Sequence, residues 1–242
     1  MRIAIIGYGK MGKAIEAIAL ERGHEIIILN GSEAPDFLQK NTADVAVEFT
    51  GPEIAAENIK RCISAGIPVV CGTTGWLAEK NSIEEFCKTH QGSFFYASNF
   101  SLGVNLFFRL NTILARMMAG NEHYKPSITE IHHTQKKDAP SGTAITLAEG
   151  IVSNNPRLTG WAAVPLNGHF PEHGQTGILQ VISERADPFP GKHTVRYTCE
   201  EDEISITHEA FSRKGFAAGA VAVAEWLPGR TGVFGMDDFL KF

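Results

Sequence analysis

Cysteine is scarce in this sequence, and the cysteines that occur show no regular pairing. Four are present among 242 residues, at Cys62, Cys71, Cys87 and Cys199, and no two of them stand in a CxxC spacing. All four sit within apolar patterns. Because disulfide frameworks and zinc sites depend on regular cysteine spacing, the sequence predicts buried free thiols.

Long apolar runs and an excess of positive charge are also missing. No apolar run approaches the ~20 residues that a membrane-spanning helix needs. The apolar start of the chain is broken at Gly7, too soon for a secretion signal. A net charge of −5 gives no basic footprint for nucleic acid. We therefore expect a soluble cytoplasmic protein with neither a membrane nor a nucleic acid as partner.

What is present is enough apolar sequence for a sizeable core, with 43% hydrophobic and 20% charged residues in one large domain or two modest ones. The first hundred residues alternate short apolar runs with helical periodicity, which indicates βαβ units and a parallel sheet. The expected strands are Arg2–Ile6, Glu25–Leu29, Asp44–Phe49, Pro68–Cys71 and Ser93–Ala97. The expected helices are Met11–Arg22, Pro52–Ala65 and Ala78–Thr89.

The pattern changes around Ser101, where a long helix over Val104–Met118 leads into a region with more strand signal. Expected strands there are Ser127–His133, Gly177–Glu184, His193–Cys199 and Glu203–His208. The last two flank the polar turn Glu200–Asp202 and predict an antiparallel hairpin. A helix over Gly215–Leu227 and a short tail follow. The sequence thus predicts an α/β Rossmann-type domain with a parallel sheet, plus an α+β domain with an open mixed sheet.

A glycine-rich turn directly follows the first expected strand. Gly7, Gly9 and Gly12 fit the pattern G-x-G-x-x-G, in which the glycines allow a tight turn, a close approach to a pyrophosphate and close helix–strand packing. Alone, the pattern also fits an ordinary βα turn. Its place between a strand and a helix predicts a dinucleotide site that includes Tyr8, Lys10 and Met11.

The end of the second strand bears on the choice of dinucleotide. A ribose-binding carboxylate is expected about 20 residues after the glycine turn, but the chain has Asn30-Gly31-Ser32 there and no acid before Glu33. Without that carboxylate, nothing repels a 2′-phosphate, to which Asn30 and Ser32 could donate hydrogen bonds and Lys10 or Lys13 supply charge. This pattern favours NADPH, with NADH still usable.

The most informative stretch of the chain runs from Glu130 to Ala144. Two histidines, two lysines and an aspartate fall within seven residues, His132–Asp138, and a Pro-Ser-Gly-Thr turn then precedes a helical pattern over Ala144–Ile151. Proton donors thus stand beside a helix start whose free N–H groups favour an anion. Ser141, Gly142 and Thr143 could equally be a plain N-cap. The composition suits a small carboxylated substrate that is protonated during reaction.

A zinc site is the alternative for the two histidines. Zinc needs three or four ligands, and neither a cysteine nor a glutamate is spaced as a partner, while His169 and His173 are loosely patterned. We therefore expect no metal. Because adjacent residues at a strand end point to opposite faces, His132 and His133 cannot both have the same role.

Together these segments resemble the dihydrodipicolinate reductase family of bacterial and plant lysine biosynthesis. The family signature Glu-x-His-His-x-x-Lys-x-Asp-Ala-Pro-Ser-Gly-Thr-Ala is matched at every fixed position from Glu130 to Ala144. Three more stretches are similar to the family: Glu48-Phe49-Thr50, Gly72–Gly75 and Ser98–Asn105. Many members carry an acidic residue at the end of the second strand, a pattern from which this chain departs.

The resemblance implies an NAD(P)H-dependent reductase that converts dihydrodipicolinate into tetrahydrodipicolinate and assembles as a homotetramer. It implies a dinucleotide domain of residues 1–101 and 214–242 and a substrate and oligomerisation domain of residues 102–213. It carries the proton-donor role to His132, substrate binding to His133, and a catalytic or substrate-binding role to Lys136. The loops that it places against the cofactor contain Phe49, Thr50, Gly72, Thr73, Thr74, Ala97, Ser98, Asn99 and Phe100.

Two other classes compete with this interpretation. A dinucleotide sensor that retains the fold would not need the proton donors His132, His133 and Lys136. A related two-domain dehydrogenase acting on another small acid would lack the His-His-x-x-Lys stretch. Oxidation of NAD(P)H in the presence of substrate separates the reductase from the sensor.

Overall fold

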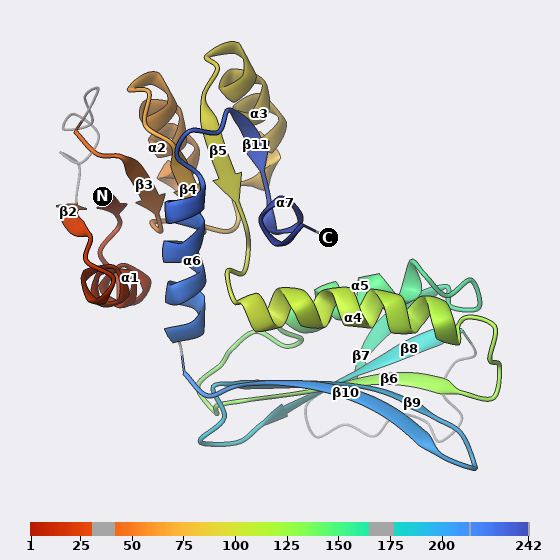
Figure 1. Cartoon of the computed structure of the whole chain (residues 1–242). Coiled ribbons are helices and arrows are strands. Elements are labelled where there is room, and N and C mark those ends of the chain that lie inside the picture. The colour runs from red at the N-terminus through yellow and green to blue at the C-terminus, as the bar shows by residue number, and fades with distance from the viewer. Residues whose placement is uncertain (31–41, 165–176, 213, 242) are drawn as a thin grey trace. The chain divides into compact units, whose positions relative to one another are not determined.

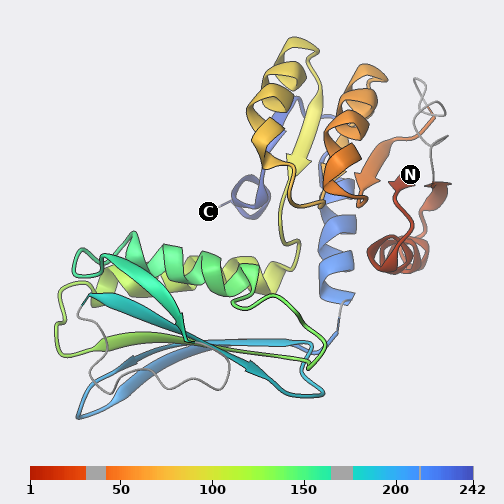
Figure 2. The same cartoon turned by 180° about the vertical axis from the view of Figure 1, so that it is seen from behind.

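The computed structural model describes residues 1–30, 42–164, 177–212 and 214–241. Its contacts divide the chain into two compact units, one comprising Met1–Leu102 with Lys214–Phe242 and the other Gly103–Arg213. Figures 1 and 2 show both units from opposite sides. Each unit has its own sheet and its own core.

The first unit is built on a parallel six-stranded sheet in the order β11-β5-β4-β3-β1-β2. Its strands are β1 (Arg2–Ile6), β2 (Glu25–Leu29), β3 (Val45–Glu48), β4 (Val69–Cys71), β5 (Ser93–Tyr96) and β11 (Gly232–Phe234). Its helices are α1 (Lys10–Glu21), α2 (Pro52–Ser64), α3 (Lys80–Thr89), α6 (Lys214–Trp226) and α7 (Met236–Leu240), with a 3₁₀ turn at Leu77–Glu79.

Helices cover both faces of this sheet, and successive residues of a strand face the two sides in turn. Ala4 and Ile6 of β1 face one core, formed with α2 and α3. Ile3 and Ile5 face the other, formed with α1 and α6. Figure 1 shows these helix pairs on opposite sides of the sheet.

The strand order reverses between β1 and β3. From β1 the chain crosses to β2 on one side, and β3, β4 and β5 then follow on the other side. The turns after β1 and β3 therefore diverge at the carboxyl edge of the sheet. That edge is where open α/β sheets form a ligand crevice.

The second unit contains a mixed five-stranded sheet in the order β10-β9-β6-β8-β7. The strands are β6 (Lys125–His132), β7 (Gly160–Val164), β8 (Ile178–Arg185), β9 (Gly191–Thr198) and β10 (Glu203–Ala210). Helices α4 (Leu102–Met118) and α5 (Gly142–Val152) cover one face, where they pack on Ile128, Val181 and Val195 (Figure 2).

The predicted fold class is confirmed, and each predicted strand and helix exists. The bounds of Arg2–Ile6 and Glu25–Leu29 match those predicted, and most of the other bounds differ by one or two residues. The hairpin across Glu200–Asp202 is confirmed as the antiparallel pair β9–β10. The helix expected over Ala78–Thr89 is divided by the 3₁₀ turn. Three elements were missed: β7, β11 and α7. The first is rich in glycine and alanine, and the other two are very short, so neither pattern nor propensity marks them.

Two further expectations concern the cysteines and membrane-spanning helices. All four cysteines are free; Cys62, Cys71 and Cys87 are buried, whereas Cys199 is half-buried. The prediction of burial was therefore wrong for Cys199, whose Sγ lies 3.5 Å from the Asp202 carbonyl in the hairpin turn. No helix among the described residues is long and apolar enough to cross a membrane.

Candidate functional site

The glycine turn after β1 is packed so tightly that two of its glycines admit no side chain. A Cβ at Gly7 would lie 2.3 Å from the Phe49 carbonyl oxygen, and one at Gly12 would lie 2.3 Å from the Gly7 carbonyl oxygen. Gly7 also has a φ of +93°, which favours glycine. A Cβ at Gly9 would meet nothing within 4 Å. The turn therefore locks β1 to α1 while it leaves open space beside Gly9, the N-cap of α1.

A cavity of about 740 Å³ opens beside this turn. Several residues expected to bind cofactor line this cavity: Gly7, Tyr8, Gly9, Asn30, Phe49 and Thr50. One whole side of it was missed from the sequence, because it comes from a single helix, α2. That side consists of Glu53, Ile54, Glu57, Asn58 and Arg61.

Glu48 joins the turns after β3 and β4 and is fully buried. Its carboxylate accepts hydrogen bonds from the Thr50 backbone N–H at 3.2 Å, from the Thr50 hydroxyl and from the Cys71 thiol at 3.2 Å. The Thr50 N–H also donates to the Thr73 hydroxyl at 2.9 Å. Burial, followed by the charge of Glu48, raises the pKa of the Cys71 thiol, which stays protonated. Glu48 thus links the turn after β3 to the turn after β4.

Several of the remaining expected loop residues have structural contacts that explain their identity. A Cβ at Gly72 would lie 2.2 Å from the Phe49 ring, so glycine is required for that ring to lie there. Phe100 is 3% exposed and packs against Phe49 with ring centroids 5.8 Å apart. Ala97 is also buried, whereas Thr74 and Ser98 are exposed. The Asn99 side chain accepts a hydrogen bond from the Ser101 N–H at 2.9 Å.

Asn30 directly follows β2 and is exposed. Ser32 lies outside the described residues. Lys10 is exposed, Met11 is half-buried, and Lys13 lies 5.7 Å from the Tyr8 ring centroid. The Tyr8 hydroxyl donates to the Glu16 carboxylate, which raises the pKa of Tyr8.

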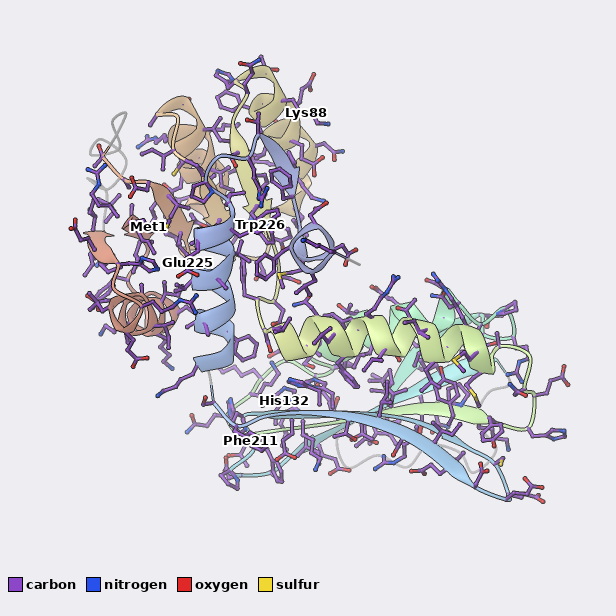
Figure 3. The ribbon with its side chains drawn as sticks, in the orientation of Figure 1. Met1, Lys88, His132, Phe211, Glu225 and Trp226 are labelled. Atoms are coloured by element: carbon purple, nitrogen blue, oxygen red, sulfur yellow. The ribbon has the colours of Figure 1, made fainter. Side chains whose placement is uncertain are left out.

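In the second unit, His132 ends β6 on the face covered by α4 and α5 (Figure 3). It is 7% exposed, and its Nδ1 lies 3.3 Å from Oε2 of Glu130, two residues earlier on the same face of the strand. Among the described residues, Nδ1 has no hydrogen-bond partner of good geometry, and its 3.3 Å contact with this carboxylate is within ion-pair distance. His133 is half-buried.

Glu130 itself is fully buried and surrounded by donors. Burial opposes its ionisation, but the nearby His132 and His193 rings and the hydrogen bonds from Ser141 and Ser183 outweigh that cost and hold the pKa of Glu130 well below its usual range. Oxygen Oε1 accepts from the Ser183 hydroxyl at 2.7 Å, and Arg185 Nη2 lies 3.6 Å from it. Glu130 is therefore a buried carboxylate anion.

Lys136 lies in the loop after β6, and its Nζ is 2.8 Å from both carboxylate oxygens of Asp138. This contact, with a smaller opposing effect of burial, lowers the pKa of Asp138. Asp138 thus contacts Lys136 directly. Arg185 holds the same loop by donating to the carbonyls of Lys136 at 3.2 Å and Asp138 at 2.6 Å. Lys137 is exposed.

The start of α5 combines N-capping with a link to the histidines. Ser141 is the N-cap, and its Oγ accepts from the Ala144 N–H at 3.3 Å. Its backbone N–H lies 3.1 Å from both oxygens of Glu130. Its Oγ is also 3.0 Å from Nε2 of His193 on β9. Gly142 is exposed and Thr143 half-buried at the first turn.

These contacts bring together three side chains of types that can bind a metal ion. Glu130, His132 and His193 are all buried and offer ligand atoms within 4.8 Å of one another. The premise that no glutamate is spaced as a partner was wrong, because Glu130 is two residues from His132. The Glu130 oxygens already accept from Ser141 and Ser183, so the expectation of no metal stays a prediction. His169 and His173 lie outside the described residues.

Comparisons with known proteins converge on one family. The models "Dihydrodipicolinate reductase, N-terminus" and "Dihydrodipicolinate reductase, C-terminus" match residues 27–100 and 103–240. A 4-hydroxy-tetrahydrodipicolinate reductase of Christiangramia forsetii is 46% identical over 242 residues, which cover 100% of this chain and 98% of that protein. The enzyme of the same name from Neisseria meningitidis is 35% identical over 93% of this chain and 83% of that protein.

A similar solved structure is the dipicolinate-bound dihydrodipicolinate reductase from Paenisporosarcina sp. TG-14. It superposes with a TM-score of 0.76 at 21% identity and covers 97% of each chain. At that identity the match supports the fold, while the sequence matches support the family.

Proposed function

Because the chain belongs to the dihydrodipicolinate reductase family, we propose that it reduces the dihydrodipicolinate ring to tetrahydrodipicolinate with NADH or NADPH, in lysine and diaminopimelate biosynthesis. The Paenisporosarcina relative binds dipicolinate. We assign to this chain a substrate of the same class, a small cyclic dicarboxylate. Its reduction requires a hydride and a proton.

We assign the dinucleotide to residues 1–101 and 214–242, and the substrate to residues 102–213. The packing of Gly7 and Gly12, the open space beside Gly9 and the adjoining cavity of about 740 Å³ all fit a bound pyrophosphate and adenosine. Bound NAD(P)H supplies the hydride. The backbone N–H groups at the start of α1 hold its pyrophosphate.

His132 supplies the proton. A hydride delivered to a ring carbon conjugated with an imine leaves electron density that a proton must quench, and an imidazolium can donate one near neutral pH. The Glu130 carboxylate lies 3.3 Å from Nδ1 and orients the ring. Lys136 pairs with a substrate carboxylate and assists proton transfer, and His133 contacts the substrate.

The start of α5 receives a substrate carboxylate. The first N–H groups of a helix have no partner within it, and the helix dipole favours an anion there. Ser141, Gly142 and Thr143 supply this cradle, and the exposed Gly142 lets an anion approach the backbone. One observation carries the assignment: Glu130 contacts both the proton donor His132 and the N-cap Ser141.

A coupled assay tests the proposal, with dihydrodipicolinate made in situ and NADH or NADPH supplied separately. The reductase oxidises the cofactor only when substrate is present, whereas a dinucleotide sensor binds the cofactor and leaves it reduced. His132→Gln is expected to lower kcat on the order of 10²–10⁴-fold, the range for a lost general acid, with little change in cofactor affinity. His123→Gln, at an exposed position of the same unit, is the matched control. Near-wild-type turnover of His132→Gln would remove His132 from the mechanism.

We also propose that the protein is cytoplasmic and forms a homotetramer through the second unit. β10 ends the strand order of that unit's sheet, and its Ile204 is 40% exposed. Light scattering tests the assembly: a tetramer mass is expected, and Ile204→Asp should lower it. A monomer in the unaltered protein would refute it.

A further inference from the structure

Glu130 has no chemical step of its own in the proposed reaction, yet it contacts more of the site than any residue assigned one. It is fully buried. Its carboxylate accepts from the Ser141 N–H at 3.1 Å and from the Ser183 hydroxyl at 2.7 Å, and it lies 3.3 Å from His132 Nδ1. These partners come from the start of α5, from β8 and from β6. A buried anion that contacts three segments fixes their relative positions.

We propose that Glu130 is the positioning residue of this site, which sets the orientation of His132 and the start of α5 together, and that His193 anchors the same helix start from β9. This inference rests on the proposed function, since it concerns the residues that hold the proton donor and the substrate cradle.

The effect on His132 follows from hydrogen-bond roles. A carboxylate accepts only, so a ring nitrogen directed at Glu130 carries a proton. With Nδ1–H directed to Glu130, Nε2 is the atom left to give a proton. Nε2 lies next to Gly191 of β9, where a Cβ would come within 3.0 Å of it. The ring is therefore held between an anion on one side and a glycine that leaves it room on the other.

The effect on the helix start follows from the number of free donors. Glu130 takes the Ser141 N–H, which precedes the first turn. The N–H groups of Gly142 and Thr143 belong to that turn and have no acceptor within the helix. Glu130 thus fixes the helix start and leaves the next donors for a substrate carboxylate.

His193 completes the anchor. It is directly opposite Glu130 in the antiparallel pair β6–β9, and its Nε2 lies 3.0 Å from Ser141 Oγ. Burial, with repulsion from His132 and Lys136 and only partial compensation by Glu130, lowers the pKa of His193. A neutral Nε2 can accept a hydrogen bond from the Ser141 hydroxyl. The oxygen of that hydroxyl then still accepts a hydrogen bond from the Ala144 N–H.

Charged groups of several elements act on this pair. Arg185 of β8 lies 3.6 Å from Glu130, and His193 of β9 lies 3.6 Å from it. Lys136 follows β6 and repels His193, while His193 in turn acts on His208 of β10 through its charge. Glu130 is the one carboxylate within 4 Å of His132 among the ion pairs of the described residues. Its replacement by glutamine therefore removes the negative charge next to the His132 ring.

Glu130→Gln tests the proposal, with Glu48→Gln as matched control because both glutamates are fully buried. Glu130→Gln should lower kcat by roughly 10- to 100-fold, as for carboxylates that orient a functional histidine. Loss of the negative charge 3.3 Å from His132 Nδ1 should also change the pH profile of kcat. Affinity for pyridine-2,6-dicarboxylate, measured by calorimetry, should also fall. Glu48→Gln should raise the KM for cofactor and leave the pH profile and dicarboxylate affinity as in the unaltered protein.

His193→Leu separates the two effects and covers the case in which Glu130→Gln does not fold. His193 contacts Ser141, while its ring meets His132 only edge-on at 5.0 Å between centroids. This variant should weaken dicarboxylate binding by roughly 2- to 13-fold, the equivalent of one neutral hydrogen bond, without moving the pH profile.

Either of two outcomes would overturn the positioning role: an unchanged pH profile in a folded Glu130→Gln variant, or unchanged dicarboxylate binding in His193→Leu. Failure of the proposed function is distinct, because the unaltered protein would then not oxidise NAD(P)H with substrate.

Discussion

Replacement of Lys136 by alanine tests the position of the substrate. A charge-assisted hydrogen bond from a lysine to a substrate carboxylate contributes roughly 1.5–3 kcal/mol. In the structure, however, Lys136 Nζ already contacts both oxygens of Asp138 at 2.8 Å, and the Asp138 side chain is 64% exposed. Weakening such an exposed pair costs about 0–1 kcal/mol. The net contribution is therefore roughly 0.5–3 kcal/mol, or about 2- to 140-fold in affinity.

The assay is competitive inhibition of NAD(P)H oxidation by pyridine-2,6-dicarboxylate, which resembles the substrate but does not readily accept hydride. Lys136→Ala should raise the inhibition constant by that factor, and Asp138→Asn should lower it slightly because it frees Lys136 and removes a negative charge. Lys137→Ala is the control, since Lys137 is exposed in the same loop. Equal losses for the two lysines, or no competition at all, would mean that the substrate lies elsewhere.

Three further predictions concern the cofactor, the glycine turn and pH. NADPH should bind at least as tightly as NADH, and Asn30→Asp should weaken NADPH selectively by about 5-fold or more through charge repulsion; calorimetry that shows strong NADH preference in the unaltered protein would contradict this. Gly12→Ala should destabilise the fold by about 1–3 kcal/mol in urea unfolding, because its Cβ would lie 2.3 Å from a backbone oxygen, whereas Gly120→Ala, with nothing within 4 Å, should stay within about 0.5 kcal/mol. Burial lowers the pKa of His208, so the stability contributed by the neutral ring is present above the unfolded pKa of about 6.5 and is lost as pH falls toward the lowered folded pKa. His208→Gln should therefore flatten the fall of the thermal midpoint below pH ~6.5. An unchanged slope in this variant would refute the prediction.

The elements that carry a local signal were predictable. The β1–turn–α1 unit was found because its glycines mark a turn, and the structure adds the reason, which is backbone contact at Gly7 and Gly12. The end of β6 at His132 was found because strand and turn patterns change within a few residues. In both cases neighbours in sequence are neighbours in space.

What could not be predicted depends on contacts between distant segments. Glu130 and His193 meet because β6 and β9 pair in one register, although the two residues are 63 positions apart in the sequence. Arg185 contacts the loop of Lys136 because β8 lies parallel to β6. The contribution of α2 to the cavity was hidden as well, although the exposed Ile54 is a sign of it once burial is known. Register and helix orientation are properties of the folded chain, and no local pattern encodes them.

The most direct test of the proposed reduction follows the hydride itself. NADPH or NADH that carries deuterium at the transferable position would be incubated with the protein and dihydrodipicolinate made in situ, and the product would be analysed by mass spectrometry. We predict tetrahydrodipicolinate that carries the deuterium on a ring carbon, formed in step with cofactor oxidation and suppressed by His132→Gln. Bound but unoxidised cofactor, or cofactor oxidation with no label in the product, would contradict the account.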